Sequence, residues 1–133
     1  MAEELSQNGI MNINNGANIS IITPEYNQIR QMILRDNTQR MVLGKNIVIL
    51  ASSVTTGKTI RTAQNCVSYY GGRVCGVSSI FSSVPEVDGF QVNCIFTDKD
   101  IPGYEAYANE DCPYCKQGMK IDALVNSYGY SKL

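Results

Sequence analysis

The chain has 133 residues, enough for one domain that buries about two thirds of the surface of its unfolded chain. Eleven basic and twelve acidic residues give a formal charge of -1, which offers no electrostatic case for a nucleic acid or membrane-surface partner. No apolar run approaches the roughly 20 residues that span a bilayer, and the chain does not open like a signal peptide. We therefore expect a single cytoplasmic domain, residues 1–133, with a small ligand.

The first nine residues predict the last turns of a helix that ends at Gly9, because Ala2 and Leu5 share one face. In a doubly wound sheet such a helix normally follows a strand. The pattern leaves two alternatives: a complete, reduced domain, and a chain that lacks a first strand and its loop.

Residues 18–23 form a β-branched run that ends at Pro24. This pattern predicts a parallel strand whose carboxyl end points toward the ligand, with Glu25 and Tyr26 near that edge.

Residues 27–45 form a long connection with only a weak helical clustering at Ile29, Met32 and Ile33. Such connections are either mobile functional loops or solvated surface segments, and both alternatives stay open. As a functional loop, the segment would bring Arg30 or Arg35 close to a diphosphate group.

Residues 46–59 join a strand pattern directly to a turn and then to an amphipathic helix. The continuous apolar run at residues 47–50 is typical of a parallel strand covered on both faces. The helix is expected to begin at Lys58 and to end at Gly71 and Gly72, with apolar positions at Ile60, Ala63, Val67 and Tyr70.

The turn is rich in small residues with hydroxyl groups. A helix start leaves backbone N–H groups unpaired and carries partial positive charge. The residues expected to surround a phosphate here, called the threonine loop below, are Thr55, Thr56, Gly57, Lys58 and Thr59. The alternative is an ordinary turn whose threonines only cap the helix.

Two further strands are expected at residues 73–81 and 91–97. The link between them is too short for a crossover helix. This predicts either antiparallel neighbours or one peripheral strand.

Cysteine usage does not indicate a disulfide framework, since the count of five is odd and Cys66, Cys75 and Cys94 lie in apolar patterns. The pair Cys112 and Cys115 forms one CxxC motif. Zinc usually takes four ligands, and the chain has no histidine and no second CxxC, so we assign no metal ligand. The alternatives are a structural turn that starts a short helix at Pro113 and a redox pair, which requires a lowered thiol pKa.

Other phosphate motifs fit less well. Gly57-Lys58-Thr59 ends like a P-loop, but Ser52 stands where that motif has its first glycine. No GxGxxG follows a strand, so a dinucleotide site is not indicated.

Residues 48–59 resemble the phosphoribosyl-diphosphate motif of type I phosphoribosyltransferases, most closely the orotate phosphoribosyltransferase-like members. The order of the elements and the late CPxCxxG segment, residues 112–118, also look like that family. The resemblance implies an α/β fold with a mainly parallel, Rossmann-like sheet. It also implies that the first strand and the diphosphate loop are missing, and that the ligand lies at the carboxyl ends of the strands that begin at Asn18 and Asn46.

By the same resemblance, the threonine loop would hold the phosphate of a ribose 5-phosphate, and Ser52 and Ser53 would contact the ribose. Arg30 or Arg35 would approach the diphosphate. Mg2+ would accompany bound phosphoribosyl diphosphate, and the chain would form a homodimer.

The chain departs from the family at Ala51 and Ser52, where an acidic pair is expected. Those carboxylates hold the ribose hydroxyls and favour a positively charged transition state, so each loss costs about 3 kcal/mol. Two functions follow from this departure. One is an orotate phosphoribosyltransferase-like protein with impaired catalysis, and the other is a noncatalytic module that senses a phosphoribosyl group or a nucleotide.

Overall fold

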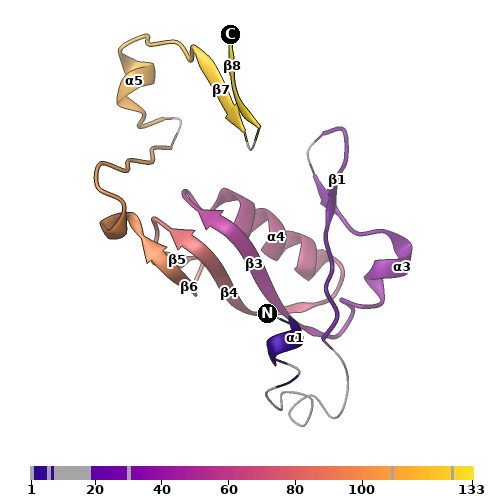
Figure 1. Cartoon of the computed structure of the whole chain (residues 1–133). Helices are drawn as coiled ribbons and strands as arrows, with labels where there is room; N and C mark the ends of the chain where they lie inside the picture. Colours follow the sequence, from indigo (N-terminus) through magenta and orange to yellow (C-terminus); the bar gives the residue numbers. More distant parts are fainter. Residues whose placement is uncertain (1, 6, 8–18, 30, 109, 127) are drawn as a thin grey trace.

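A computed structural model describes residues 2–5, 7, 19–29, 31–108, 110–126 and 128–133. Its elements are α1 (Ala2–Leu5), β1 (Glu25–Tyr26), β2 (Met32–Ile33), α3 (Asp36–Gln39), β3 (Asn46–Val54), α4 (Lys58–Tyr69), β4 (Arg73–Ser82), β5 (Glu86–Val87), β6 (Phe90–Thr97), the 3-10 helix η2 (Asp98–Asp100), α5 (Pro113–Lys116), β7 (Ala123–Asn126) and β8 (Gly129–Lys132). In the described part of the chain, the main sheet has the strand order β3-β4-β6-β5 (Figure 1). The pairs β1-β2 and β7-β8 form separate antiparallel ribbons.

The strand, turn and helix predicted for residues 46–70 are confirmed. Strand β3 pairs in parallel with β4, and α4 connects them. The helix begins at Lys58, and the chain leaves it through Gly71, whose φ of 73° is a left-handed conformation that glycine adopts without strain. The prediction of an α/β fold that contains parallel strands is therefore confirmed.

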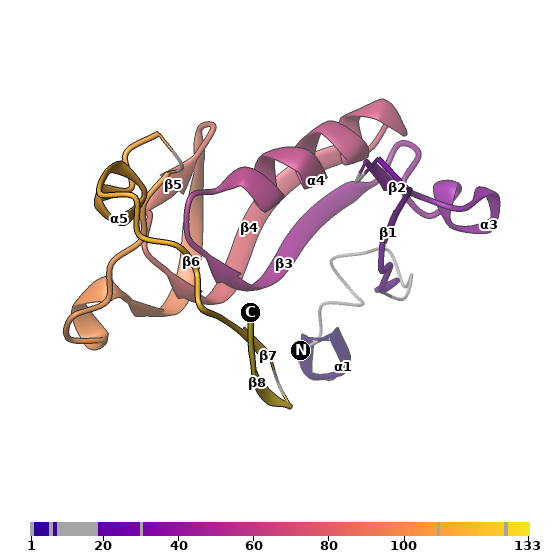
Figure 2. The same cartoon turned by 90° about the horizontal axis from the view of Figure 1, so that it is seen from above.

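Helix α4 covers one face of the sheet and belongs to both hydrophobic clusters of the core (Figures 1 and 2). The cluster near the start of the helix contains Ile49, Val54, Ile60, Val77, Val87 and Val92. The cluster near its end contains Leu34, Val42, Cys66 and Val67. Because α4 contributes to both clusters, its packing fixes how the sheet and residues 31–45 are held together.

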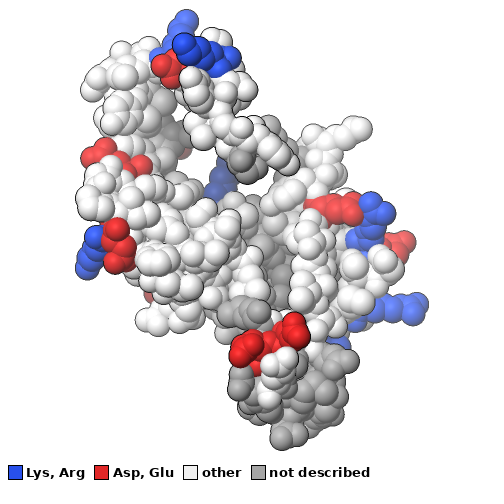
Figure 3. Space-filling view, in the orientation of Figure 1, with Lys and Arg blue, Asp and Glu red and all other residues white. Residues whose placement is uncertain are grey.

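The expectation that β3 is covered on both faces is wrong for the described residues. Four apolar side chains on the face away from α4 are more than half exposed: Val48 (54%), Leu50 (58%), Ile80 (55%) and Ile95 (72%). Figure 3 shows an uncharged surface over these strands, with most charged side chains toward its edges. The apolar run of β3 thus buries only alternate residues against α4, as a strand with a period of two requires.

The parallel strand predicted for residues 18–23 is not found in the described residues, 19–23. Instead, Glu25–Tyr26 pairs antiparallel with Met32–Ile33. The side chain of Asn27 closes this hairpin, because its Oδ1 accepts the backbone N–H groups of Ile29 and Gln31. Local hydrogen bonds of this kind compete with pairing to a larger sheet.

The helical clustering expected within residues 27–45 is also wrong, since Met32 and Ile33 form β2. Leu34 and Val42 are buried against Cys66 and Val67 of α4. Residues 31–45 therefore pack on the end of α4 and do not form an open loop.

Of the two alternatives for the strands at residues 73–81 and 91–97, the antiparallel pairing is wrong. Strand β6 is a parallel neighbour of β4, and β5 lies at the edge beside it. The link, which includes β5, runs back without a helix and turns into β6 at Asp88 and Gly89, whose φ angles of 48° and 83° are positive. Val87 of this link is buried in the same cluster as Ile60 of α4, so the link crosses on the helix side of the sheet.

The ends of the chain give mixed outcomes. A helix is present at Ala2–Leu5, whereas its predicted end at Gly9 lies outside the described residues. Pro113 begins a short helix as predicted. The hairpin β7-β8 was not predicted. No helix in the described ranges is long and apolar enough to cross a membrane.

Gly72→Ala should destabilise the protein, because a Cβ there would lie 2.7 Å from Val42 Cγ1 and 2.9 Å from Val67 Cγ1. Overpacking of this kind costs about 2 kcal/mol. Gly76→Ala is the matched control, since a Cβ at Gly76 has no atom within 4 Å. Urea unfolding should show the loss only for Gly72→Ala, and equal stabilities of the two variants would contradict this packing.

Candidate functional site

The threonine loop lies at the carboxyl end of β3 and borders a small hollow of about 40 Å³. The hollow is lined by Ser53, Val54, Thr55, Thr56, Gly57, Lys58, Thr59 and Ile60. The structure thus brings together all five residues predicted to surround a phosphate. Ser53 joins them, whereas Ser52 does not line the hollow.

The hydrogen-bond donors of this loop are unpaired in the described part of the chain. Gly57 stands at the N-cap of α4 with φ 75° and ψ -1°, and no side chain caps the helix. The hydroxyls of Thr55, Thr56 and Thr59 make no hydrogen bond to described residues, and the loop's backbone N–H groups donate to no backbone acceptor there. The alternative in which threonines cap the helix is therefore wrong, and the donors remain available to an anion.

Hydrogen bonds to the backbone carbonyl groups of Thr55 and Thr56 hold the loop in its shape. Arg61 donates from Nη1 to the Thr56 carbonyl at 3.0 Å and from Nε to Asp88 Oδ1 at 3.0 Å. Ser83 Oγ donates to the Thr55 carbonyl at 3.0 Å. These bonds hold the loop's acceptors away from the hollow and tie the loop to residues 83–88.

Gly57 also contacts the link between β4 and β6. A Cβ on this glycine would lie 2.8 Å from Val87 Cγ2, and its positive φ independently disfavours other residues. Glycine is therefore required at this position for two separate reasons.

Ala51 and Ser52 lie within β3 and point to opposite faces of the sheet, because successive strand residues alternate. Ala51 packs against the core cluster beneath α4 and is paired in register with Ser79 of β4. The Ser79 hydroxyl is buried and has no hydrogen-bond partner among the described residues. Neither position 51 nor position 52 supplies a carboxylate.

Arg35 is not brought to the threonine loop. Its guanidinium binds both carboxylate oxygens of Glu25, at 2.5 and 3.1 Å, and this contact raises the pKa of Arg35. The neighbouring Leu34 N–H donates to the Tyr70 hydroxyl at the far end of α4, a helix about 18 Å long. Arg30, the other predicted diphosphate contact, lies outside the described residues.

Sequence reasoning missed Arg61, Ser83, Val87 and Asp88, which shape the loop. Arg61 looked like one more polar residue on a helix. Its partner Asp88 is 27 positions away, so no local pattern connects them. The Asp88-Gly89 dipeptide, a turn signal, was the one available hint.

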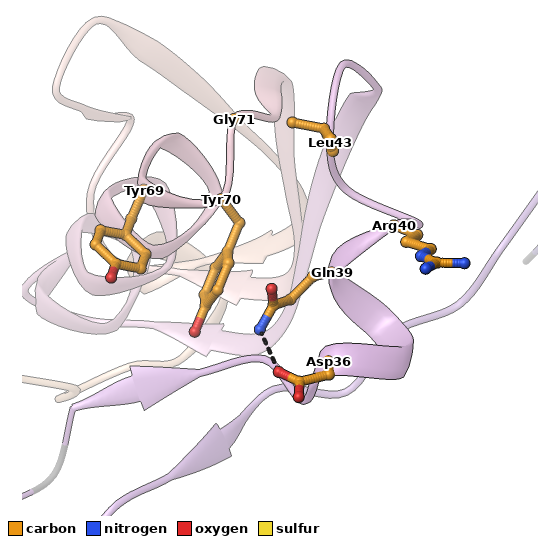
Figure 4. A pocket seen from close by; sticks show the side chains of 7 residues that line it. All are labelled: Asp36, Gln39, Arg40, Leu43, Tyr69, Tyr70 and Gly71. Carbon is orange, nitrogen blue, oxygen red and sulfur yellow. Dashed lines mark hydrogen bonds between the residues drawn. The ribbon is translucent and has the colours of Figure 1, made fainter.

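A larger hollow of about 420 Å³ lies at the other end of α4 (Figure 4). It is lined by Asp36, Gln39, Arg40, Leu43, Tyr69, Tyr70 and Gly71. Gln39 Nε2 donates to Asp36 Oδ1 at 3.1 Å across part of its wall. No residue predicted to bind a ligand lines it.

The donor set of the threonine loop does not suit a metal ion held by protein side chains. No carboxylate lines the small hollow. Within the described residues no three His, Cys, Asp or Glu side chains gather at one point. Mg2+ prefers carboxylate and phosphate oxygens, so this chain's residues do not fit a Mg2+ site of their own.

No protein-family profile matches the chain. The chain is 35% identical over 80 residues to the orotate phosphoribosyltransferase of Thermoanaerobacter sp. (strain X514). This alignment covers 59% of this chain and 40% of that protein. It is also 32% identical over 78 residues to the orotate phosphoribosyltransferase of Pelotomaculum thermopropionicum. This alignment covers 57% of this chain and 39% of that protein.

The chain is similar to orotate phosphoribosyltransferases over more than half of its length. This relationship was predicted from the threonine loop and is confirmed to that extent. The chain spans about two fifths of the length of the curated relatives it matches.

Arg61→Leu should loosen the threonine loop, because it removes the donor to the Thr56 carbonyl and the ion pair with Asp88. Hydrogen exchange of the Arg61 and Ser83 amides, which donate to the Gly57 and Val54 carbonyls beside the loop, should become about three- to fivefold faster, as expected for partly exposed charge-assisted bonds. Arg73→Leu is the control, since the Arg73 side chain makes no hydrogen bond or ion pair with described residues. Unchanged exchange in Arg61→Leu would show that these bonds do not hold the loop.

Proposed function

We propose that the threonine loop binds the phosphate of a 5-phosphoribosyl group, carried by phosphoribosyl diphosphate or by a nucleoside monophosphate. The observation that carries this proposal is the set of unpaired N–H and hydroxyl donors around one hollow at the start of α4. The similarity to orotate phosphoribosyltransferases supports ribose phosphate over another anion.

The chemistry of the loop suits a phosphate. A phosphate group would accept hydrogen bonds from backbone N–H groups, from the hydroxyls of Thr55 and Thr59, and from the Lys58 ammonium. The hollow, at about 40 Å³, is far smaller than the roughly 300 Å³ or more of a typical organic ligand pocket. The sugar and base would therefore extend outside it, past Ser53.

We propose that catalysis is impaired in this orotate phosphoribosyltransferase-like chain. Ala51 and Ser52 supply no carboxylate for the ribose hydroxyls or for the positive charge of the transition state. The loss of each such contact lowers the rate about a hundredfold. Binding of the phosphate does not depend on these two residues, so binding and transfer are separable in this chain.

The alternative is a noncatalytic module that senses a phosphoribosyl group or nucleotide. One observation favours it: the hollow has donors for a phosphate but no carboxylate for ribose chemistry.

Several finer features stay predictions. These are the ribose contacts of Ser52 and Ser53, the diphosphate contact of Arg30 or Arg35, Mg2+ bound together with phosphoribosyl diphosphate, a single domain over residues 1–133, a homodimer and a cytoplasmic location.

Calorimetry with ribose 5-phosphate should give a dissociation constant of about 1 mM or lower. Thr59→Val should weaken binding about fivefold, the effect of one lost hydrogen bond. Thr62→Val is the matched control, because the Thr62 hydroxyl already donates to the Lys58 carbonyl within α4. The absence of binding by the native chain at millimolar concentrations would overturn the proposed function.

Diphosphate release from phosphoribosyl diphosphate and orotate separates the two alternatives. The native chain should bind phosphoribosyl diphosphate with little release, and Ala51→Asp combined with Ser52→Asp should increase release at least about tenfold. Each single variant and a urea unfolding curve control for stability, because Ala51 packs against the core. Rapid release by the native chain would refute impaired catalysis, and a folded double variant that binds without release would favour the sensing module.

A further inference from the structure

Cys112 and Cys115 lie within one turn at the start of α5. Cys112 is the N-cap residue, Pro113 is the first helical residue, and the Cys115 N–H donates to Cys112 Sγ at 3.4 Å. The short helix continues only to Lys116. The two side chains are therefore held on the same side of one turn, the spacing at which residues three apart approach each other.

The two thiols have different acidities. The backbone N–H of Cys115 lowers the pKa of the Cys112 thiol, and the Cys115 side chain and Lys116 add to this effect. The hydrogen bond to Cys112 raises the pKa of Cys115. The Cys112 thiol therefore ionises more readily than the Cys115 thiol.

Solvent reaches this pair. Cys115 is exposed and Cys112 is half-buried. The charged groups nearby are an ion pair of Lys116 with Asp111, at 4.0 Å, and Glu105, which accepts the hydroxyl of Tyr107 at 2.5 Å. This bond raises the pKa of Tyr107 to about 12, so the phenol stays neutral beside the thiols.

The remaining cysteines, Cys66, Cys75 and Cys94, lie in α4, β4 and β6. Burial raises the pKa of Cys66, and the exposed Cys75 donates from its sulfur to the Ile47 carbonyl at 3.4 Å. Neither has a second thiol within one turn of its own segment. Cys75 therefore provides an exposed cysteine for comparison.

We propose that Cys112 and Cys115 form a reversible dithiol–disulfide site that exchanges with small disulfides such as oxidised glutathione. The Cys112 thiolate attacks one sulfur of the small disulfide, forms a mixed disulfide and releases one thiolate. The Cys115 thiol then loses its proton, attacks Cys112 Sγ and displaces the second thiolate. In total, the protein loses two protons and two electrons, and the small disulfide gains them and becomes two thiols.

A zinc site fits the described geometry less well. Tetrahedral zinc takes four ligands, and no third His, Cys, Asp or Glu joins this pair among the described residues. Two adjacent thiols of unequal pKa are what thiol–disulfide exchange requires. This site is independent of the threonine loop, so the proposal does not rest on the proposed function.

To test this, the full chain is equilibrated in glutathione buffers that contain an increasing fraction of oxidised glutathione. The reaction is then quenched with acid, free thiols are alkylated, and the peptides are analysed by mass spectrometry. The peptide that ends at Lys116 contains both thiols and should lose two hydrogens, while Cys75 remains open to alkylation. Under limiting iodoacetamide, Cys112 should react about tenfold faster than Cys75.

Three variants define the roles of the thiols. Cys115→Ser should trap a glutathione adduct on Cys112, and Cys112→Ser should slow adduct formation at Cys115 about tenfold. Cys75→Ser is the control and should behave like the native chain at Cys112 and Cys115.

Two outcomes would overturn the proposal. One is glutathione modification of Cys75 and Cys112 at equal rates with no internal disulfide. The other is zinc bound at one ion per two chains, measured by native mass spectrometry, that protects both thiols from alkylation.

Discussion

The contact between Gly57 and Val87 is the constraint on which the geometry of the threonine loop depends. A side chain at Gly57 would collide with Val87 Cγ2 at 2.8 Å, and the φ of 75° turns the chain from β3 into α4. Val87 reaches this position only because residues 83–89 return along the helix side of the sheet. A segment 30 positions further along the chain therefore determines how the loop directs its N–H groups. The loop is local in sequence, but its shape is a product of tertiary packing.

This dependence explains which features could be predicted from the sequence. The unit of β3, loop and α4 could be predicted because its signals are local: an apolar run, helical spacing and a glycine stop. The five loop residues were predicted for the same reason. The parallel pairing of β6 could not be predicted, because the crossing without a helix depends on the burial of Val87. The hairpin at Glu25–Tyr26 was missed because the Asn27 hydrogen bonds outweigh the β-branched pattern before it.

The hydrogen-bonding groups of the candidate site are distributed unevenly. The threonine loop has donors without partners, which are suited to an anion. Earlier in β3, Ala51 is paired in register with Ser79, whose buried hydroxyl has no partner among the described residues. A buried hydroxyl without a partner costs about 1–3 kcal/mol, and a carboxylate at position 51 would be a suitable acceptor. The buried polar group without a partner and the unpaired donors therefore lie close together in sequence, one beside the strand and the others at the start of the helix.

The thiol pair illustrates the same limit of sequence reasoning on a smaller scale. A CxxC motif is compatible with a metal, a structural turn or redox chemistry, and composition alone does not separate them. The observation that favours redox chemistry is the direction of one N–H group: Cys115 donates to Cys112 Sγ, and this bond lowers the pKa of the Cys112 thiol. That direction follows from the extended backbone of Cys112, with φ -62° and ψ 113°, and from Pro113, whose ring favours the first helical position. In both places the residue types determine which chemistry is possible, and the first turn of a helix determines where the backbone N–H groups point. At the start of α4 they are left without acceptors, and at the start of α5 one of them donates to Cys112 Sγ.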